Sequence, residues 1–121
     1  NVLNAAQKYS FAAPPPIGIE NISNNVPSEF FLHQNFPNPF NPVTTIRFDY
    51  LKTGIGNDVM LSVFDVNGRR IAEYRFSGLT SGTYQVTFDG AALASGIYFY
   101  SISDFRNSVS KKMILMLATQ V

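Results

Sequence analysis

The chain has 121 residues, of which 45% are hydrophobic, 14% aromatic and only 14% charged, and it contains no cysteine. A chain of this length is typical of one domain, which buries on the order of 60–70% of its unfolded surface in a single core. The formal net charge of +1 excludes the basic footprint of a nucleic-acid-binding or anionic-membrane-binding domain, and the absence of cysteine excludes disulfides, thiolate metal sites and thiol nucleophiles.

No apolar run approaches the roughly 20 residues needed to span a bilayer. The longest run covers residues 113–118, which is the length of a strand, so we predict no membrane span. The chain begins at Asn1 without an initiator methionine or a charged and apolar leader. We interpret it as a processed product whose export signal lay upstream.

Residues 1–28 are predicted to form a linker or extended arm, and residues 29–121 the folded domain. Residues 1–13 carry only a weak helical pattern, which ends at Pro14-Pro15-Pro16, where an extended polyproline II connector is expected. Asn24-Asn25, followed by Pro27, is typical of a loop.

A proline-rich segment follows at the start of the domain, where residues 31–48 read Phe-Leu-His-Gln-Asn-Phe-Pro-Asn-Pro-Phe-Asn-Pro-Val-Thr-Thr-Ile-Arg-Phe. Pro37, Pro39 and Pro42 each fix φ, lack a backbone donor and disfavour the α conformation in the preceding residue. We therefore predict that residues 36–42 are extended or turned, and that they enter a β-domain without joining its sheet.

Short apolar runs separated by turn signals about every ten residues favour an all-β sandwich or barrel over βαβ units. Ile46, Phe48 and Tyr50, for example, alternate with polar residues as in a half-buried strand. We predict strands at residues 29–34, 44–50, 59–66, 70–77, 83–89, 96–103 and 108–117.

Two of these strands have a predicted environment. Asn67-Gly68 separates the third and fourth strands, and because it provides the positive φ of a tight hairpin, we expect these strands to be antiparallel neighbours. The strand at 96–103 is apolar on both faces. This favours an interior strand whose second face is covered by aromatic packing, by the arm or by another molecule.

Few residues suit catalysis or metal binding. His33 is the only histidine and has no acid near it in the sequence, so we interpret it as structural or solvent-facing. Asp65 and Asp89 precede glycine-containing turns, where a carboxylate accepts hydrogen bonds from the local backbone, and we favour this role over calcium binding. We predict no catalytic residue, metal, cofactor or small-molecule substrate.

Several segments together carry a family resemblance. The opening segment fits the pattern F-x-L-x-Q-N-Y-P-N-P-F-N-P-x-T-x-I with Phe36 in place of tyrosine. The matching residues include Leu32, Gln34, Asn35, Pro37, Asn38, Pro39, Phe40, Asn41, Pro42, Thr44 and Ile46. Residues 63–69 (with Asn67 and Gly68), 88–90, 94–100 and 111–113 continue the match in order. The chain thereby resembles the type A C-terminal sorting domain of the type IX secretion system, over residues 28–117.

The resemblance implies a seven-stranded antiparallel Ig-like β-sandwich with an extended N-terminal arm and no catalytic activity. It also implies a secretion label. The outer-membrane translocon and its shuttle components are expected to recognise the folded domain in the periplasm and to carry an attached cargo to the cell surface or outside the cell.

Recognition is expected at Gly96, Tyr98, Lys111, Lys112, Met113 and Leu115. Residues 113–117 form an apolar edge that a partner could cover by strand addition or by pocket burial. The lysine pair is equally consistent with a plain solvated edge.

The residues leave two other functions open. In a structural subunit of an extracellular filament or sheath, residues 1–28 of one subunit would pack on the sheet of the next, a homo-oligomeric contact that propagates without closing. A carbohydrate-binding sandwich would use Tyr9, Tyr50, Tyr74 or Tyr84 as a stacking platform, although aromatic side chains at strand spacing are more often core residues.

Overall fold

The computed structural model describes residues 19–53, 58–104 and 106–118, and every regular element in these ranges is a β-strand. The strands are β1 (Ile19–Ser23), β2 (Phe31–Leu32), β3 (Val43–Tyr50), β4 (Val59–Phe64), β5 (Arg70–Phe76), β6 (Gly82–Asp89), β7 (Gly96–Ser103) and β8 (Ser108–Leu115). Within these ranges there is accordingly no helix long and apolar enough to cross a membrane.

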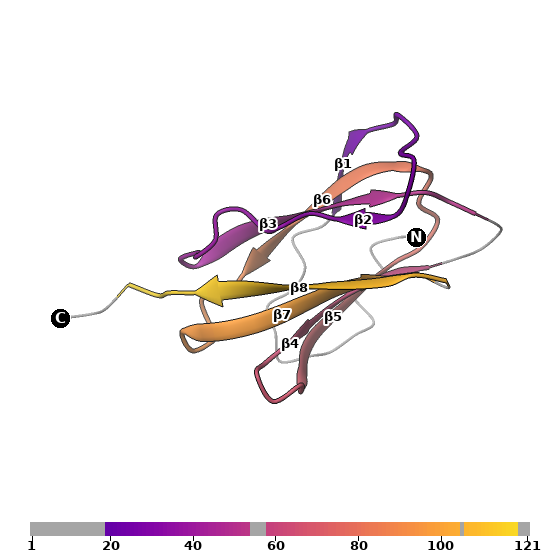
Figure 1. Ribbon diagram of the computed structural model, residues 1–121. Coiled ribbons are helices and arrows are strands. Elements are labelled where there is room, and N and C mark those ends of the chain that lie inside the picture. The colour runs from indigo at the N-terminus through magenta and orange to yellow at the C-terminus, as the bar shows by residue number, and fades with distance from the viewer. Residues whose placement is uncertain (1–18, 54–57, 105, 119–121) are drawn as a thin grey trace.

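The strands form two four-stranded sheets that lie one over the other (Figure 1). One sheet has the order β1-β6-β3-β2, the other has the order β5-β4-β7-β8, and all neighbouring strands are antiparallel. This arrangement confirms the predicted antiparallel β-sandwich, with eight strands in place of seven.

The additional strand, β1, comes from the segment that the sequence assigned to the arm. It pairs with β6, with Ile19 opposite Val86 and Ser23 opposite Thr83. The two strands approach closely, because a Cβ added at Gly82 would lie 2.5 Å from the Ser23 carbonyl oxygen. Alternation in residues 19–23 is poor because three of the five are exposed and none is fully buried, and the strand is held by backbone pairing. Residues 1–18 of the predicted arm lie outside the described ranges.

The core lies between the sheets and follows the alternation of the strands. In β3 and β6 every second residue is buried, so Ile46 and Val86 face inward while Arg47 and Gln85 face outward. The buried apolar residues are Leu32, Phe40, Ile46, Phe48, Tyr50, Val59, Leu61, Val63, Ala72, Tyr74, Phe76, Leu79, Tyr84, Val86, Phe88, Tyr98, Tyr100, Ile102, Met113 and Leu115. Full burial of one such side chain contributes about 1.5–3 kcal/mol, and this core stabilises a chain that has no disulfide.

The structure confirms the predicted hairpin and the interior position of the strand at 96–103, whereas the second face of that strand, with Ile97 and Phe99, is not covered within the described residues. β4 and β5 pair through a hairpin in which Gly68 has a φ of 80°. The Asp65 carboxylate accepts hydrogen bonds from the Asn67 and Arg69 backbone N–H groups, which confirms its role in the turn. β7 is an interior strand between β4 and β8.

Candidate functional site

The proline-rich part of the family pattern, residues 34–42 and hereafter the motif loop, connects the two sheets. Phe36 and Thr45 of β3 exchange backbone hydrogen bonds of 3.0 and 2.9 Å. Phe40 then forms a parallel bridge with Leu115 at the end of β8. As the prolines predict, the segment between these two bridges consists of bends. The prediction that residues 36–42 do not join the sheet is wrong at Phe36 and Phe40, which each pair with a strand.

The backbone of Phe40 pairs directly with the outer edge of β8. The Phe40 N–H donates to the Ile114 carbonyl at 2.9 Å, and the Met116 N–H donates to the Phe40 carbonyl at 2.9 Å. A loop residue therefore occupies the position that a neighbouring strand would take.

Amide side chains of the motif loop extend this pairing. The Asn38 Oδ1 accepts a hydrogen bond from the Ile114 N–H at 2.9 Å, and the Asn41 Oδ1 accepts one from the Ala118 N–H at 3.3 Å. The Gln34 Nε2 donates to the Lys112 carbonyl at 2.8 Å. The edge of β8 is thus satisfied from Lys112 to Ala118, and strand addition along this edge is blocked in the folded domain.

Asn35 fixes the start of the motif loop from inside the sandwich. Its side chain is buried and donates to the Thr44 Oγ1 at 3.0 Å and to the Pro37 carbonyl at 3.2 Å. Its backbone N–H donates to the Tyr100 hydroxyl at 2.7 Å, and this hydroxyl donates to the His33 carbonyl at 2.8 Å. Burial raises the pKa of Tyr100 to about 12.

The Phe40 ring anchors the loop in the core. It is 1% exposed and meets Phe88 edge-on with ring centroids 6.2 Å apart. A Cβ added at Gly90 would lie 3.3 Å from the Phe40 ring and 3.1 Å from Leu115. The glycine at residue 90 therefore leaves room for this contact between loop and strand.

The residues predicted for recognition fall into two groups. Tyr98, Met113 and Leu115 are buried, whereas Lys112 is exposed and Lys111 is half-buried. The first three cannot be touched by a partner while the domain is folded, because alternate residues of β7 and β8 point into the sandwich.

Gly96 begins β7 with a φ of 155°, a conformation that L side chains rarely adopt. In the turn before it, the Ser95 Oγ accepts a hydrogen bond from the Leu117 N–H at 2.9 Å. This turn therefore holds Leu117, just after β8, from the β7 side, while the motif loop holds the same segment from the other side.

Outward-facing side chains at one end of β7 and β8, with Met116 just beyond β8, form a surface that we call the β7–β8 outer face: Ile97, Phe99, Lys112, Ile114 and Met116. Ile97 lies opposite Ile114 and Phe99 lies opposite Lys112 in the register, so these side chains share one face of the sheet. Ile97, Phe99 and Met116 are 41%, 38% and 59% exposed. Such a cluster of exposed apolar side chains is typical of an interaction site.

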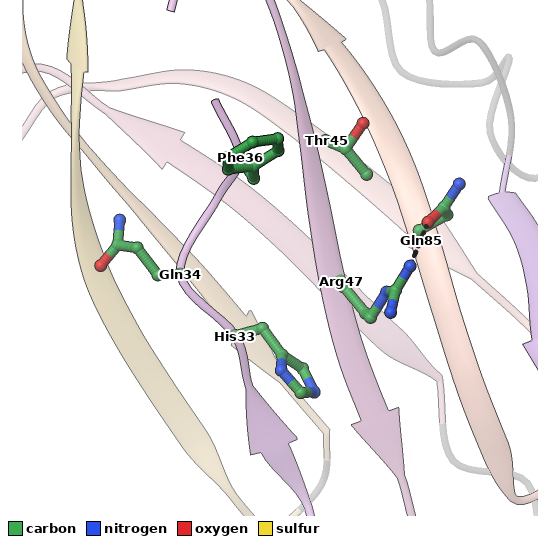
Figure 2. A pocket seen from close by; sticks show the side chains of 6 residues that line it. All are labelled: His33, Gln34, Phe36, Thr45, Arg47 and Gln85. Atoms are coloured by element: carbon green, nitrogen blue, oxygen red, sulfur yellow. Dashed lines mark hydrogen bonds between the residues drawn. The ribbon is translucent and has the colours of Figure 1, made fainter. Parts of the chain in front are cut away.

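A second feature lies on the outer face of the other sheet. It is an open cleft of about 400 Å³, lined by His33, Gln34, Phe36, Thr45, Arg47 and Gln85 (Figure 2). Phe36 and Thr45 lie toward one end and His33 toward the other, with Arg47 between them, while the Gln34 side chain points toward β8. Phe36 is 78% exposed.

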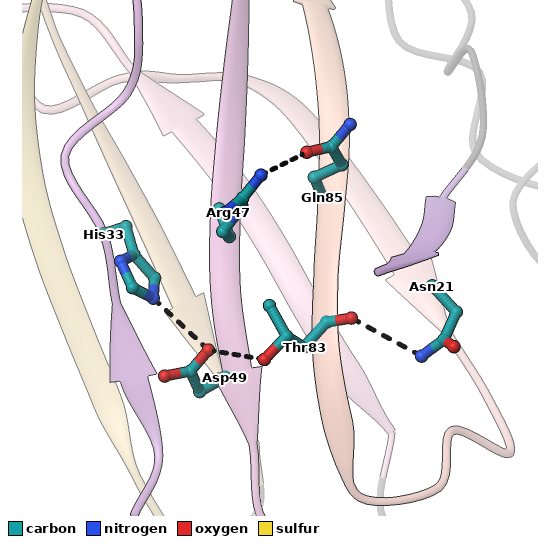
Figure 3. A network of polar contacts seen from close by, with 6 residues as sticks. All are labelled: Asn21, His33, Arg47, Asp49, Thr83 and Gln85. Atoms are coloured by element: carbon teal, nitrogen blue, oxygen red, sulfur yellow. Dashed lines mark hydrogen bonds and ion pairs between the residues drawn. The ribbon is translucent and has the colours of Figure 1, made fainter. Parts of the chain in front are cut away.

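His33 lies in a polar network rather than in a catalytic arrangement (Figure 3). Its Nε2 lies 3.2 Å from the Asp49 Oδ1, and the Thr83 hydroxyl donates to the same oxygen at 3.0 Å. In a nucleophilic triad the hydroxyl contacts the imidazole, whereas here both contact the carboxylate. Among the described residues no group of three histidine, cysteine, aspartate or glutamate side chains is placed to hold a metal ion.

The tyrosine platform suggested by the sequence is wrong for three of its four residues. Tyr50, Tyr74 and Tyr84 are buried in the sandwich, and Tyr9 lies outside the described ranges. The filament hypothesis required the arm to pair with a neighbouring subunit. The described end of that arm, Ile19–Ser23, pairs instead with β6 of its own chain.

Neither the cleft nor the ion pair between His33 and Asp49 was predicted from the sequence, because each joins residues from different strands. The alternation of the strand at 44–50 does place Arg47 and Asp49 on the outer face. Only the sheet order shows that His33 and Gln85 flank them.

Comparisons with known proteins agree with this fold. The family model of the secretion system C-terminal sorting domain matches residues 34–116. The crystal structure of dimeric latent PorU from Porphyromonas gingivalis is similar at 18% identity and a TM-score of 0.57, over 80% of this chain and 10% of the PorU chain. A conjugative transposon lipoprotein from Bacteroides eggerthii DSM 20697 matches at 15% identity and a TM-score of 0.42, over 74% of this chain and 98% of that chain.

No curated protein matches the chain significantly. The chain spans about a tenth of the length of the PorU chain, and the likeness to PorU concerns the fold alone. The family model, by contrast, covers well over half of the chain and includes both the motif loop and β8. The protein therefore belongs to the family of type IX secretion system C-terminal sorting domains.

Proposed function

We propose that this chain is a non-catalytic sorting domain that directs an attached cargo across the outer membrane to the cell surface or beyond. Its membership of the sorting-domain family supports this role. Because the motif loop already pairs with the edge of β8, this edge is not free to bind a partner as an extended tail. This supports recognition of the folded domain. The folded domain meets the secretion machinery in the periplasm.

The observation that carries this proposal is that alternate side chains along β8 are buried and exposed. Met113 and Leu115 are inserted in the core, and the motif loop and Ser95 hold the backbone on both sides. Lys112 and Met116 are consequently presented outward in a fixed geometry. A preordered surface of this kind binds without a large loss of conformational entropy.

The proposed contact surface is the β7–β8 outer face. It surrounds one ammonium group, that of Lys112, with the apolar side chains of Ile97, Phe99 and Met116. Apolar side chains at the centre of an interface supply affinity, and a charge that meets a complementary charge supplies specificity. The proposed partners are the outer-membrane translocon and its shuttle components, through a surface with an acidic group among apolar side chains.

The decisive experiment is a secretion assay with a reporter fused in front of the domain, in a bacterium that has a type IX system. Deletion of residues 111–121 is expected to trap the reporter in the periplasm. This deletion alone does not separate recognition from folding, because it also removes Met113 and Leu115 from the core.

A variant with changes only at the surface separates recognition from folding. The double substitution Phe99→Ser and Lys112→Glu changes only exposed side chains, so the melting temperature should stay close to that of the parent, while the reporter should accumulate in the periplasm. Phe36→Ala, on the other sheet, is the matched control and should be secreted normally. Normal secretion of the double variant would exclude the β7–β8 outer face, and normal secretion of the deletion variant would exclude the sorting role itself.

A further inference from the structure

A bulge beside β3 turns Phe36 toward solvent. The His33 N–H donates to the Arg47 carbonyl at 2.9 Å, and Phe36 pairs with Thr45. Between these points the loop has two residues, Gln34 and Asn35, and β3 has one. A β-bulge of this kind re-aims the side chains that follow it. Asn35 accordingly points into the core and the Phe36 ring stands on the outer face.

Planar polar groups beside Phe36 are held in fixed positions. The Arg47 Nη2 donates to the Gln85 Oε1 at 3.1 Å, and the Gln85 Nε2 donates to the Glu20 Oε1 at 2.9 Å. The row therefore runs across β3, β6 and β1, and Figure 3 shows the bond between Arg47 and Gln85. A second row of hydrogen-bonded side chains, two residues further along β3, joins His33, Asp49 and Thr83. Side chains held by their neighbours lose little conformational entropy when a ligand binds.

This face has no excess of positive charge, because it carries one guanidinium, that of Arg47, and two carboxylates, those of Glu20 and Asp49, and this narrows the class of ligand. Arg47 is the one permanently charged group that lines the cleft, and Glu20 and Asp49 lie in the two polar rows beside it. A phosphate-bearing ligand such as a nucleic acid needs an excess of basic groups, which is lacking here. A ligand with neutral groups that both donate and accept hydrogen bonds fits the alternating guanidinium, amide and carboxylate groups.

We propose that this cleft binds a neutral oligosaccharide. The apolar C–H face of a pyranose ring would stack on the Phe36 ring, since burying apolar surface on an aromatic ring is favourable. Its hydroxyl groups would bond to Arg47, Gln85 and Thr45. The cleft volume of about 400 Å³ lies in the range of small-ligand sites, which measure roughly 300–1,000 Å³.

An added peptide strand is a poorer occupant of this face. β3 is paired on both sides, with β2 and with β6, and a strand paired on both sides has no free backbone groups to offer. The proposal does not rest on the sorting role. It concerns a different sheet from the β7–β8 outer face.

The test is a titration of the full chain, followed by amide NMR, with hexasaccharides of β-1,4-linked glucose, mannose and N-acetylglucosamine, and with hexagalacturonate as an acidic arm. At least one neutral hexasaccharide should shift the amides of Phe36, Arg47 and Gln85, with a Kd of about 1 mM or tighter. Binding of the acidic sugar alone, or no shift at these amides with any neutral sugar, would overturn the proposal.

Matched variants identify the site. Phe36→Ala and Arg47→Met should each weaken binding about tenfold, as expected for the loss of one stacking or one charged hydrogen-bonding contact. Phe99→Ala removes an exposed phenylalanine from the opposite sheet and should leave the affinity unchanged. Equal losses in Phe36→Ala and Phe99→Ala, with both variants folded by their melting temperatures, would contradict binding in the cleft.

Discussion

At the scale of single residues, the amide side chains of the motif loop have different structural roles. Asn35 is buried and bonded inside the sandwich, whereas Asn38 and Asn41 bond to the backbone of β8 at the surface. All three asparagines belong to one sequence motif, which does not distinguish the buried position from the two surface positions. The penalty for losing each depends on whether water can replace the lost bond.

Asn35→Ala is accordingly expected to be the most damaging substitution of the three. It removes the donor to the Thr44 Oγ1 and to the Pro37 carbonyl, and the first of these bonds is buried. We expect the free energy of unfolding to fall by about 1–3 kcal/mol, measured by urea denaturation. Asn24→Ala, at an exposed position, is the control and should have no measurable effect. Equal stability of the two variants would show that the buried network is dispensable.

Asp65 gives a prediction about pH. The pKa of its carboxyl is held below the ordinary value, first by the Arg69 backbone N–H, and then by the Asn67 N–H and the Arg69 side chain. Because the folded-state pKa lies below the unfolded-state pKa, the contribution of this group to stability is present above the unfolded-state pKa. It is lost as the pH falls through the folded-state pKa.

An NMR titration of the Asp65 carboxyl carbon checks this assignment. The midpoint should lie below that of the same carboxyl in the urea-unfolded chain. Since the backbone N–H of residue 69 is the largest cause, Arg69→Ala should leave the midpoint lowered. A return to the unfolded-state midpoint in Arg69→Ala would instead assign the shift to the guanidinium group.

At the scale of elements, the first family motif holds β8 in place. The motif loop contains two phenylalanines with opposite environments, Phe36 at 78% exposed and Phe40 at 1%. Phe40 fills the space between Phe88 and Leu115, and its backbone pairs with Ile114 and Met116. The ring therefore determines how firmly the end of β8 is held.

Phe40→Ala should destabilise the domain by about 3–5 kcal/mol, as for other buried aromatic residues. Phe36→Ala, four residues earlier, should change stability by less than about 0.5 kcal/mol. Amide hydrogen exchange at Met116 should accelerate in Phe40→Ala and stay unchanged in Phe36→Ala. Unchanged exchange at Met116 in Phe40→Ala would mean that the loop does not hold the strand.

At the scale of the whole molecule, the sequence predicted what depends on local patterns. A short apolar run between turn signals placed the strand at 96–103 to the residue, and Asn67-Gly68 predicted the β4–β5 hairpin. The hydrogen bonds between residues 38–41 and the β8 segment have no local sequence pattern, because the bonded residues are separated by more than 70 positions in the chain. β1 was missed for a related reason, since a strand with few buried side chains has weak alternation.

The pairing of β1 leads to the last prediction, which concerns the edge of the whole sandwich. β6 lies between β1 and β3, so removal of residues 1–23 would turn β6 into an edge strand with unpaired backbone groups. Such an edge promotes pairing with a second copy of the chain. Residues 24–121 alone should therefore melt at a lower temperature and should associate as the concentration rises, as measured by analytical ultracentrifugation.

The matched control is the chain of residues 19–121, which keeps β1 and should remain monomeric with a higher melting temperature. The comparison separates the role of β1 from that of residues 1–18, because the two chains differ only in residues 19–23. If both chains were monomeric and melted together, β1 would be dispensable and the stable sandwich would begin at β2. If only the shorter chain associated, β1 would serve as an internal cover that protects the sheet from edge-to-edge contact.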